Sequence, residues 1–429
     1  MTGVIFANAT GVGGAIAVFR LSGAGVARVI AALAGEIPAA RRASLRRLRD
    51  RAGGLIDEGL VLWFPGPASA TGEDYAELQV HAGRAVAAAV TAALVDLGAR
   101  PAEPGEFARR AFGNGRLDLI EAEGIADLIA AETEGQRRLA LDQAGGAMGI
   151  VIASWRSRLI GLMAQLAALI DFADEDLPAD VEAAMLGEMA ALRGEFGAVL
   201  ARGAAAERIR EGIDIVVLGA PNAGKSTLVN AIVGEEVAIV SDIAGTTRDV
   251  IGVRLDLNGV PVRLVDTAGL REARDVIEAE GVRRAWAQVA RADLVLLCAA
   301  APDFIEPVVP GSVRTLRIAT KMDLGGAIPA GMLALSARSG AGMAGLIEAL
   351  HEAVGALVAR GAGPSLPRPR QVACVRDMAE AFDRAMGVCA AELRAAELQV
   401  AADALGRLVG VIGVEDVLDQ VFSSFCIGK

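Results

Sequence analysis

A glycine-rich octapeptide at residues 219–226 limits this chain to a small group of folds. It reads Gly-Ala-Pro-Asn-Ala-Gly-Lys-Ser, follows an apolar run at 213–219 and precedes a helical pattern that begins near Ser226. Glycines at such a turn let backbone N–H groups curl around phosphates without a Cβ in the way. In this pattern Lys225 reaches the outer phosphates and the Ser226 hydroxyl binds Mg²⁺. The sequence therefore predicts a strand, a phosphate-binding loop and a helix.

Two downstream segments fit the remaining phosphate and magnesium chemistry. Asp266-Thr267-Ala268-Gly269 stands at the end of an apolar run, where an acid can hold the Mg²⁺ shell and a glycine amide can sense the γ-phosphate. Thr247, in the segment 245–249 before another predicted strand, is placed to add a second hydroxyl to Mg²⁺. Each segment alone also fits a polar turn. Their order after the phosphate loop favours a nucleotide site.

Base selection is expected from two loops further on. Lys321-Met322-Asp323 follows an apolar run at 314–319, and the Asp323 carboxylate can accept from the N1 and amino groups of guanine, which adenine does not offer in that pattern. Ser336-Ala337-Arg338 follows the next run, where a backbone N–H can meet the guanine carbonyl. The ordered set resembles the translation-factor-related GTPases, in which Asn is usual where Thr320 stands here. Because Thr lacks the amide, we expect weaker base contact and loop tethering.

The residue that activates water is not evident from these motifs. In Ras-like enzymes a Gln directly after the DxxG motif orients the attacking water, and here that position is Leu270. Catalysis must come from another residue or from a partner. A positive charge beside the transferring phosphoryl group is worth ~10³–10⁵ in rate, so a chain without one would be a slow switch.

Periodicity divides the chain into four expected segments. Residues 1–116 mix β-like runs with one Ala-rich helix, and residues 117–208 read as long packed helices. Residues 363–429 begin within a Pro-rich linker at 361–370 and continue as a helical stretch at 371–420. Residues 209–362 alternate strands with helices, which predicts a parallel sheet covered on both faces. The expected strands are 4–7, 16–20, 60–64 and 77–80, then 213–219, 250–257, 262–266, 294–298, 314–319 and 332–336, and the Ala-rich helix is 84–97. The fold class is a multidomain α+β and α/β chain: an N-terminal α+β domain, a helical domain, and an inserted Ras-like P-loop domain with a doubly wound sheet.

Composition narrows the class further. Hydrophobic residues make up 53% of the chain, with a mean hydropathy of +0.44, but its apolar runs are broken by charge, which argues against a membrane protein. The four cysteines form no CxxC pair, which favours a reducing cytoplasm. A net charge of −11 argues against broad nonspecific nucleic-acid binding. Six arginines at 41–51 form either a solvated surface turn, which we favour, or a local basic patch.

Further segments are similar to one family, the MnmE (TrmE) family of tRNA modification GTPases, over nearly the whole chain. The most specific is the C-terminus, which reads Phe-Ser-Ser-Phe-Cys-Ile-Gly-Lys at residues 422–429. The others are residues 71–74, 104–107, 110–115, 117–119, 126–129, 238–249 and 266–272.

This resemblance implies an activity and several partners. Members act with the flavoprotein MnmG (GidA) and add an aminomethyl-type group, such as carboxymethylaminomethyl, to carbon 5 of the wobble uridine of certain tRNAs. The one-carbon unit comes from 5-formyl- or methylene-tetrahydrofolate. The N-terminal segment is then a folate-binding domain that forms a homodimer. The G domains meet across their switch regions with K⁺ in the place of an arginine finger, which fits the Leu270 position because a bound cation can neutralise phosphoryl charge.

Site residues follow from the same resemblance. The residues expected at GTP are Asn222, Ala223, Gly224, Lys225, Ser226, Thr227, Ser241, Asp242, Ile243, Ala244, Gly245, Thr246, Thr247, Asp266, Thr267, Ala268, Gly269, Lys321, Asp323, Ser336, Ala337 and Arg338. Mg²⁺ is expected at Ser226 and Thr247, K⁺ at Asn222, Ser241, Ile243 (through its carbonyl) and Thr246, and folate at Arg20, Glu77, Arg116 and Lys429. Glu278 matches the catalytic glutamate, although most surface glutamates are simply solvated.

Two other functions remain open at this stage. One is a GTP-dependent switch of ribosome assembly without folate chemistry, which would need a basic RNA-binding module that an acidic chain with helical flanks does not favour. The other is a folate-binding aminomethyltransferase-like protein in which the G domain only regulates. The sequence favours a cytoplasmic GTP hydrolase acting in tRNA modification.

Overall fold

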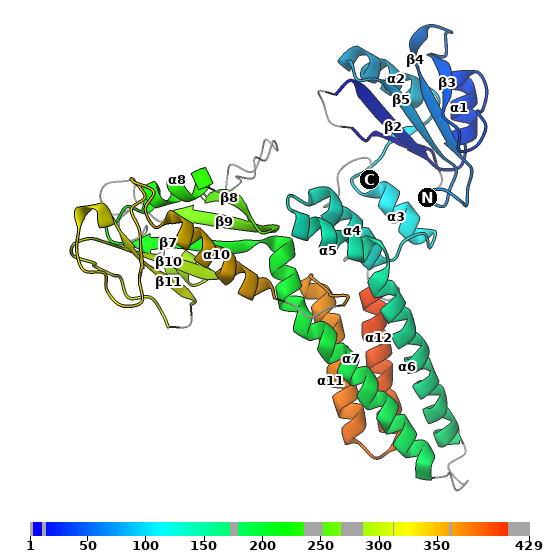
Figure 1. Ribbon diagram of the computed structural model, residues 1–429. Helices are drawn as coiled ribbons and strands as arrows, with labels where there is room; N and C mark the ends of the chain where they lie inside the picture. Colours follow the sequence, from blue (N-terminus) through cyan, green and yellow to red (C-terminus); the bar gives the residue numbers. More distant parts are fainter. Residues whose placement is uncertain are drawn as a thin grey trace, which may run out of the picture. The chain divides into compact units, whose positions relative to one another are not determined.

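The computed structural model describes residues 3–10, 14–171, 179–235, 252–266, 286–311, 313–359 and 363–410. The chain divides into two compact units (Figure 1). One comprises residues 1–126 together with 403–429, and the other comprises residues 127–402. Helices α4 (Leu119–Ala130) and α12 (Ala391–Val409) each continue across a boundary between the units.

The first unit is built on a six-stranded sheet in the order β3-β4-β5-β2-β1-β6. The strands are β1 (Ile5–Asn8), β2 (Ile16–Ser22), β3 (Ser44–Arg49), β4 (Leu55–Phe64), β5 (Tyr75–His81) and β6 (Arg100–Pro101). Its helices are α1 (Val26–Ala34), α2 (Arg84–Asp96), α3 (Glu106–Gly113) and the first part of α4. Apolar side chains of β2 to β5 pack with those of α1 and α2 in one buried core, of which Phe19, Ile30, Leu78 and Leu94 are central. This confirms the predicted α+β class of the unit.

One expectation for this unit is wrong. The arginines at 41–51 do not form a surface turn, because residues 44–49 are the edge strand β3, paired antiparallel with β4. The pattern Ser-Leu-Arg-Arg-Leu-Arg does not predict a strand, because Leu48 is its only side chain that is fully buried against the core. The other large positions of β3 face solvent wholly or in part.

Long helices form one part of the second unit. They are α5 (Glu134–Ala144), α6 (Ala147–Asp171), α7 (Ala179–Glu211) and α11 (Pro369–Gly387), with the first part of α12. Three aromatic rings tie the bundle together: Phe196 of α7 stands edge-on to Trp155 of α6 at 4.8 Å and to Phe382 of α11 at 5.2 Å between ring centroids. All three rings are fully buried.

One helical segment of the described chain, Glu134–Asp171, is long and apolar enough to cross a membrane by length and composition, with a hydropathy of 1.2 in its most apolar window. Packing explains part of that composition, since 28% of the window is buried in the protein. Met148, Ile152, Trp155 and Leu159 recur every three or four residues along α6 and are buried in the bundle. On the same helix, Arg158 forms ion pairs with Glu188 and Glu195 of α7.

The rest of the second unit is a doubly wound domain around a second six-stranded sheet, in the order β12-β11-β10-β7-β9-β8. The strands are β7 (Ile213–Gly219), β8 (Gly252–Leu257), β9 (Val260–Asp266), β10 (Leu294–Ala300), β11 (Thr315–Thr320) and β12 (Leu333–Ala334), and the helices are α8 (Lys225–Glu235) and α10 (Met343–Val358), with a 3₁₀ turn at Met322–Leu324. Five of these strands are parallel as predicted. The expectation of a wholly parallel sheet is wrong at β8, which pairs antiparallel with β9 through the tight turn Asn258-Gly259.

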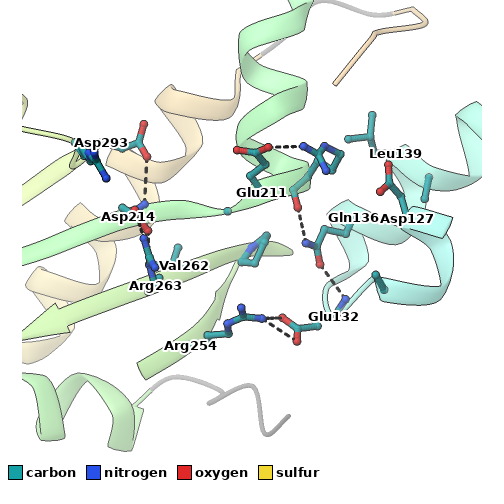
Figure 2. A pocket seen from close by; sticks show the side chains of 16 residues that line it. Asp127, Glu132, Gln136, Leu139, Glu211, Asp214, Arg254, Val262, Arg263 and Asp293 are labelled. Atoms are coloured by element: carbon teal, nitrogen blue, oxygen red, sulfur yellow. Dashed lines mark hydrogen bonds and ion pairs between the residues drawn. The ribbon is translucent and has the colours of Figure 1, made fainter. Parts of the chain in front are cut away.

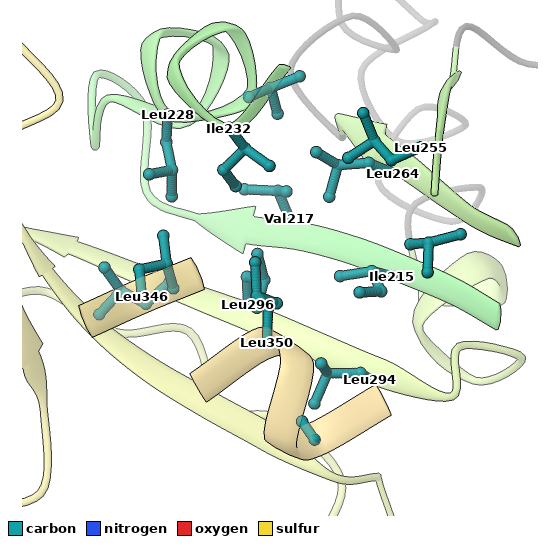
Figure 3. Close-up of a cluster of buried hydrophobic side chains, with 14 of the residues drawn as sticks. Ile215, Val217, Leu228, Ile232, Leu255, Leu264, Leu294, Leu296, Leu346 and Leu350 are labelled. Atoms are coloured by element: carbon teal, nitrogen blue, oxygen red, sulfur yellow. The ribbon is translucent and has the colours of Figure 1, made fainter. Parts of the chain in front are cut away.

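Alternation along the central strand explains why both faces of this sheet are covered. Ile215 and Val217 face the core that α8 and α10 close, where Leu228, Ile232, Leu346 and Leu350 pack (Figure 3). Val216 and Leu218 point to the opposite face and pack with Val289 and Val295. The run at 213–219 is apolar except at Asp214, because the side chains from Ile215 to Leu218 all meet a covered face.

The helices and this sheet domain meet at a short joint. Helix α7 ends at Glu211 and β7 begins at Ile213, so Gly212 alone lies between them, with φ +97°. Nearby, the Gly135 amide of α5 donates to the Gly259 carbonyl of the β8–β9 turn at 2.9 Å. A Cβ on Gly135 would lie 2.4 Å from that oxygen, so this approach of two backbones requires glycine.

Candidate functional site

The phosphate-loop residues form a tight turn between β7 and α8. Gly219 ends the strand against β10, and a Cβ there would lie 2.4 Å from the Cys298 carbonyl oxygen. Asn222 (φ 59°) and Gly224 (φ 83°) both take left-handed backbone conformations, which curl the loop back toward the start of the helix. The sequence-predicted strand, loop and helix are therefore all present where the octapeptide lies.

Lys225 is buried at the first position of α8. Its Nζ donates to the carbonyl oxygens of Ala220, at 2.9 Å, and of Gly219, at 3.2 Å. The ammonium group is thus held inside the loop by the backbone of the loop itself. An ammonium so placed supplies a fixed positive charge where phosphate oxygens would approach the loop amides.

Ser226 and Asp266 come together as their positions in the fold require. Ser226 is in the first turn of α8 and Asp266 ends β9, the strand next to β7. The Ser226 hydroxyl donates to Asp266 Oδ2 at 2.5 Å. A hydroxyl and a carboxylate at the mouth of a phosphate loop are oxygen ligands of the kind that Mg²⁺ prefers.

Thr320 joins the phosphate loop to the loop that is predicted to select the base. It ends β11 and is buried, and its Oγ1 lies 2.7 Å from the Ala223 carbonyl oxygen and 3.3 Å from that of Ala299. The shorter contact carries the stronger hydrogen bond. Tethering of the two loops, expected to weaken where Thr replaces Asn, is therefore made through the hydroxyl.

A cavity of about 320 Å³ opens beside this tether. It is lined by Gly224, Thr227, Thr320, Lys321, Asp323, Leu324, Ser336, Ala337 and Arg338. Seven of these nine are predicted GTP-contact residues; the additions are Thr320 and Leu324. Loops after β7, β11 and β12 thus converge at the carboxyl ends of parallel strands, where ligands bind in open α/β sheets.

Asp323 is oriented within the cavity by Ser336. The Ser336 hydroxyl donates to Asp323 Oδ1 at 2.7 Å, and this hydrogen bond is the main reason that the pKa of Asp323 is lowered. The carboxylate therefore stays ionised and can accept from two N–H donors at once. The Ser336 amide donates to the Ala341 carbonyl at 2.9 Å, so the neighbouring amides of Ala337 and Arg338 are the better candidates to meet a ligand carbonyl.

Part of the predicted site lies outside the described residues. This applies to Ser241, Asp242, Ile243, Ala244, Gly245, Thr246 and Thr247, to Thr267, Ala268, Gly269 and Glu278, and to Lys429.

In the first unit, the register of the sheet brings two predicted folate residues together. Arg20 of β2 and Glu77 of β5 are direct cross-strand partners, and Arg20 Nε lies 3.5 Å from Glu77 Oε1. Tyr75 donates from its hydroxyl to the same Glu77 oxygen at 2.9 Å, and burial raises the pKa of Tyr75. Arg116 is exposed after α3 and lies against Gly72.

The sequence analysis does not predict a buried ion-pair network that this unit contains. Arg110 of α3, fully buried, donates to Glu106 at 3.0 Å and to Glu73 at 2.9 Å. Glu106 also accepts from Arg100 at 2.5 Å. Burial raises the pKa of Glu106, but the hydrogen bonds from Arg100, the Glu103 amide and Arg110 outweigh it and lower the pKa overall. The i, i+4 spacing of Glu106 and Arg110 was the available signal.

A second, larger cavity of about 660 Å³ lies where α5 and the end of α7 meet the β8–β9 hairpin (Figure 2). Arg254 of β8 pairs with Glu132 at 2.9 Å, and Gln136 donates to the Arg210 carbonyl at 2.9 Å across it. None of the predicted site residues lines this cavity. Most of its charged groups form ion pairs, such as that of Arg263 with Asp214, as at an internal junction.

Comparison with known proteins covers the whole chain. A family profile of the MnmE helical domain matches residues 119–426, and a profile described as the GTP-binding protein TrmE N-terminus matches residues 4–116. The chain is 74% identical over 426 residues to the tRNA modification GTPase MnmE of Acidiphilium cryptum, covering 99% of this chain and 98% of that protein. It is 54% identical over 434 residues to the MnmE of Gluconacetobacter diazotrophicus, with the same coverage.

Among solved structures, the Era protein of Aquifex aeolicus aligns with 41% of this chain and 68% of that one, at 23% identity and a TM-score of 0.25. The relatives of known sequence are far closer and extend over both units. With a complete phosphate loop, a base-selecting loop and full-length relatives at this identity, the chain belongs to the MnmE family of tRNA modification GTPases.

Proposed function

We propose that this protein is a K⁺-activated GTP hydrolase that acts with the flavoprotein MnmG on the wobble uridine of certain tRNAs. The reaction adds an aminomethyl-type group to carbon 5 of the base, using a one-carbon unit from a tetrahydrofolate. The observation that carries the proposal is the joining of the phosphate loop and the base loop by Thr320, beside a cavity that holds Asp323. Full-length similarity to MnmE proteins supports the tRNA substrate.

The described residues fit GTP. Backbone amides of 222–227 and the Lys225 ammonium would bind the phosphates, and the guanine would enter the 320 Å³ cavity. There Asp323 would accept from guanine N1 and the amino group, while the Ala337 or Arg338 amide would donate to the guanine carbonyl. Because adenine lacks this donor pair, the carboxylate selects GTP over ATP.

Mg²⁺ would be held by the Ser226 hydroxyl and, when the γ-phosphate is bound, by the Thr247 hydroxyl. The donor set fits, because the Ser226 oxygen already lies 2.5 Å from the Asp266 carboxylate, which can orient the metal's water shell. Magnesium supplies charge neutralisation at the transferring phosphoryl group. Asp266, Thr267, Ala268 and Gly269 would then follow the state of the γ-phosphate.

Potassium is proposed at Asn222, with oxygens from Ser241, Ile243 and Thr246. Asn222 fits in that its backbone is turned left-handed and its side chain is exposed at the loop. The ion's charge would supply what Leu270 cannot. Glu278 would then orient the attacking water as the catalytic glutamate.

The first unit is proposed to bind the folate through Arg20, Glu77, Arg116 and Lys429. Arg20 and Glu77 present opposite charges from neighbouring strands, which suits a ligand with a carboxylate tail and a hydrogen-bonding ring edge. We propose that residues 1–116 form this folate-binding and dimerisation domain. Residues 117–208 and 363–429 form a helical domain, residues 209–362 form the G domain, and the whole works in the cytoplasm.

The test is GTP turnover by the purified protein in KCl and in NaCl at equal ionic strength, with ATP as control. Turnover of GTP but not ATP, strongly faster in KCl, is expected. Equal slow rates in both salts would contradict the potassium site and would favour a switch that needs an outside activator. Restoration of the modified wobble uridine in cells that lack their own copy tests the tRNA reaction separately.

A further inference from the structure

The edge strand β3 carries a line of arginines that the proposed chemistry does not use. Two of the six arginines at 41–51 have structural tasks. Arg41 lies over the Phe64 ring, 5.8 Å from its centroid, and donates to the Ala68 carbonyl. Arg46 pairs with Glu36 at 2.8 Å. The remaining four, Arg42, Arg47, Arg49 and Arg51, are all exposed and are called the arginine edge here.

The side chains of the arginine edge make few and weak interactions within the protein. Arg47 lies 3.7 Å from Glu58, and both side chains are more than half exposed, so that this pair is worth at most about 1 kcal/mol. Arg49 donates to the Gly53 carbonyl at 2.9 Å. Arg42 and Arg51 make no side-chain hydrogen bond or ion pair within the described part of the chain. These guanidinium groups can therefore turn to an external anion at small cost.

The acids that lie closest in sequence are occupied. Asp50 accepts from the Gly54 amide at 2.7 Å in the β3–β4 turn. Asp57 accepts from the His81 amide and approaches the His81 ring at 2.9 Å. These hydrogen bonds do not neutralise the carboxylates, but the six arginines at 41–51 outnumber the nearby acids Glu36, Asp50, Asp57 and Glu58, so the edge is locally positive although the chain as a whole carries −11.

Protection of a sheet edge is the structural alternative, since charged side chains keep edge strands from pairing with other chains. Arg47 alone, near the exposed Leu45, would serve that purpose. A run that extends from before the strand, at Arg42, to the turn after it, at Arg51, is longer than the six-residue strand it would protect. The arginines outside the strand are not needed to protect it, and their extended arrangement favours an extended, anionic ligand.

We propose that the arginine edge is a docking surface for the phosphate backbone of tRNA. Arg47 and Arg49 project from the same side of β3, about 6.7 Å apart along the strand, so that each can meet a different phosphate. Planar guanidinium groups bind phosphate oxygens in bidentate fashion. Such contacts position an RNA without reading its sequence. This surface deepens the proposed function and rests on its tRNA substrate.

The test compares binding of bulk deacylated tRNA to the full-length protein and to the variant R47Q/R49Q/R51Q, by fluorescence anisotropy over a range of salt concentrations. The variant is expected to bind about tenfold more weakly at low salt. The slope of log K against log salt should fall by about 2 to 3, because each lost phosphate contact removes about one unit. A matched control, R84Q/R156Q/R376Q, removes the same charge from exposed arginines elsewhere and should leave the slope unchanged.

Several results would overturn the proposal. These are equal slopes for the protein and R47Q/R49Q/R51Q, an equal loss in the control variant, or undetectable binding of tRNA by the unaltered protein. So would binding of anionic phosphatidylglycerol vesicles, but not tRNA, that depends on the same three arginines. Potassium-dependent GTP turnover is measured on the same samples. It is expected to be unchanged, so a failed docking surface is distinguished from a failed GTPase assignment.

Discussion

The Thr320 hydroxyl lies 2.7 Å from the carbonyl oxygen of Ala223, 97 residues earlier in the chain, and so ties the base-selecting loop to the phosphate loop. Thr320→Val keeps the shape of the side chain and removes the donor. Because a buried carbonyl then lacks its partner, we expect a loss of about 1–2 kcal/mol, or about 5- to 30-fold in GDP affinity. Titration of fluorescent GDP measures it. Thr320→Ser keeps the hydroxyl and should bind normally; a Val variant that binds equally well would contradict the tether.

Asp323 is expected to decide which base is accepted. Asp323→Asn replaces an acceptor with an amide donor, which opposes the amino group of guanine and suits the carbonyl that xanthine carries there. We expect GDP affinity to fall about tenfold or more, because two hydrogen bonds to an ionised carboxylate are lost, while xanthosine diphosphate gains. Competition between the two nucleotides measures the reversal. Unchanged preference would show that the base does not occupy this cavity.

Ser336 should determine the lowest pH at which the nucleotide still binds. Its hydrogen bond is the main cause of the lowered pKa of Asp323, so the carboxylate remains ionised, and able to accept from guanine, to lower pH than an ordinary Asp. In Ser336→Ala the pKa moves back up, and GDP binding is lost at a higher pH as the solution is acidified below about pH 5. Binding near neutral pH should change much less. A parallel titration of Thr227→Ala, at the same cavity but not in contact with Asp323 by any described hydrogen bond, is the control.

Removal of the Ser226 hydroxyl tests the magnesium assignment. Ser226→Ala should weaken the apparent affinity for Mg²⁺ in the presence of GTP by about tenfold or more. GDP binding with Mg²⁺ chelated should be nearly the same in both proteins, since the loop amides and Lys225 remain. The measurement is GTP turnover against Mg²⁺ concentration. An equal magnesium requirement in the variant would show that Ser226 does not bind the magnesium ion.

The buried network of Arg110, Glu106 and Glu73 should govern the acid stability of the first unit. The pKa of Glu106 is lowered in the folded state, so its contribution is present above the unfolded pKa and is lost as pH falls through the folded pKa. Arg110→Met removes one partner of the buried Glu106, which keeps Arg100, and one partner of the partly exposed Glu73, and should cost about 3 kcal/mol. Trp63 lies in the buried core of this unit, so its fluorescence in a W155F/W286F background follows unfolding there.

Glu106→Gln is the companion variant for that network. It removes the titrating group, so the part of the acid sensitivity that Glu106 contributes should disappear. Arg137→Met, at an exposed ion pair on α5, should change the midpoint little, because solvent screens surface pairs. Equal loss in both Met variants would argue that the network adds nothing beyond surface charge.

Much of the G-domain sheet was predictable because its strands are buried on both faces. Apolar runs such as 215–218 and 294–298 identify a strand without knowledge of its partners, and the predicted bounds of β7 agree with the structure. The antiparallel strand β8 was misjudged because strands alternating with helices suggest parallel pairing. The Asn-Gly pair at 258–259, a strong hairpin signal, was there to correct it.

Other features depend on partners distant in sequence. Strand β3 has one fully buried side chain, Leu48, so its hydrophobic pattern is too weak to see. The contact between Arg110 and Glu73 joins residues 37 apart and follows no periodic rule. Thr320 was identified as a departure from the usual Asn, but its distance to Ala223 depends on how β7 and β11 are set beside β10, which only the folded sheet determines.

Helix α7 joins the sheet domain through Gly212, beside contacts such as the ion pair of Arg208 with Asp293 at 3.0 Å. The helix has 33 residues, so it is about 50 Å long. A rotation of about 5° at this single glycine would carry the far end of the helix through about 4 Å. A small change in backbone direction beside the phosphate loop would thus displace the opposite end of the helical bundle by about the width of a side chain.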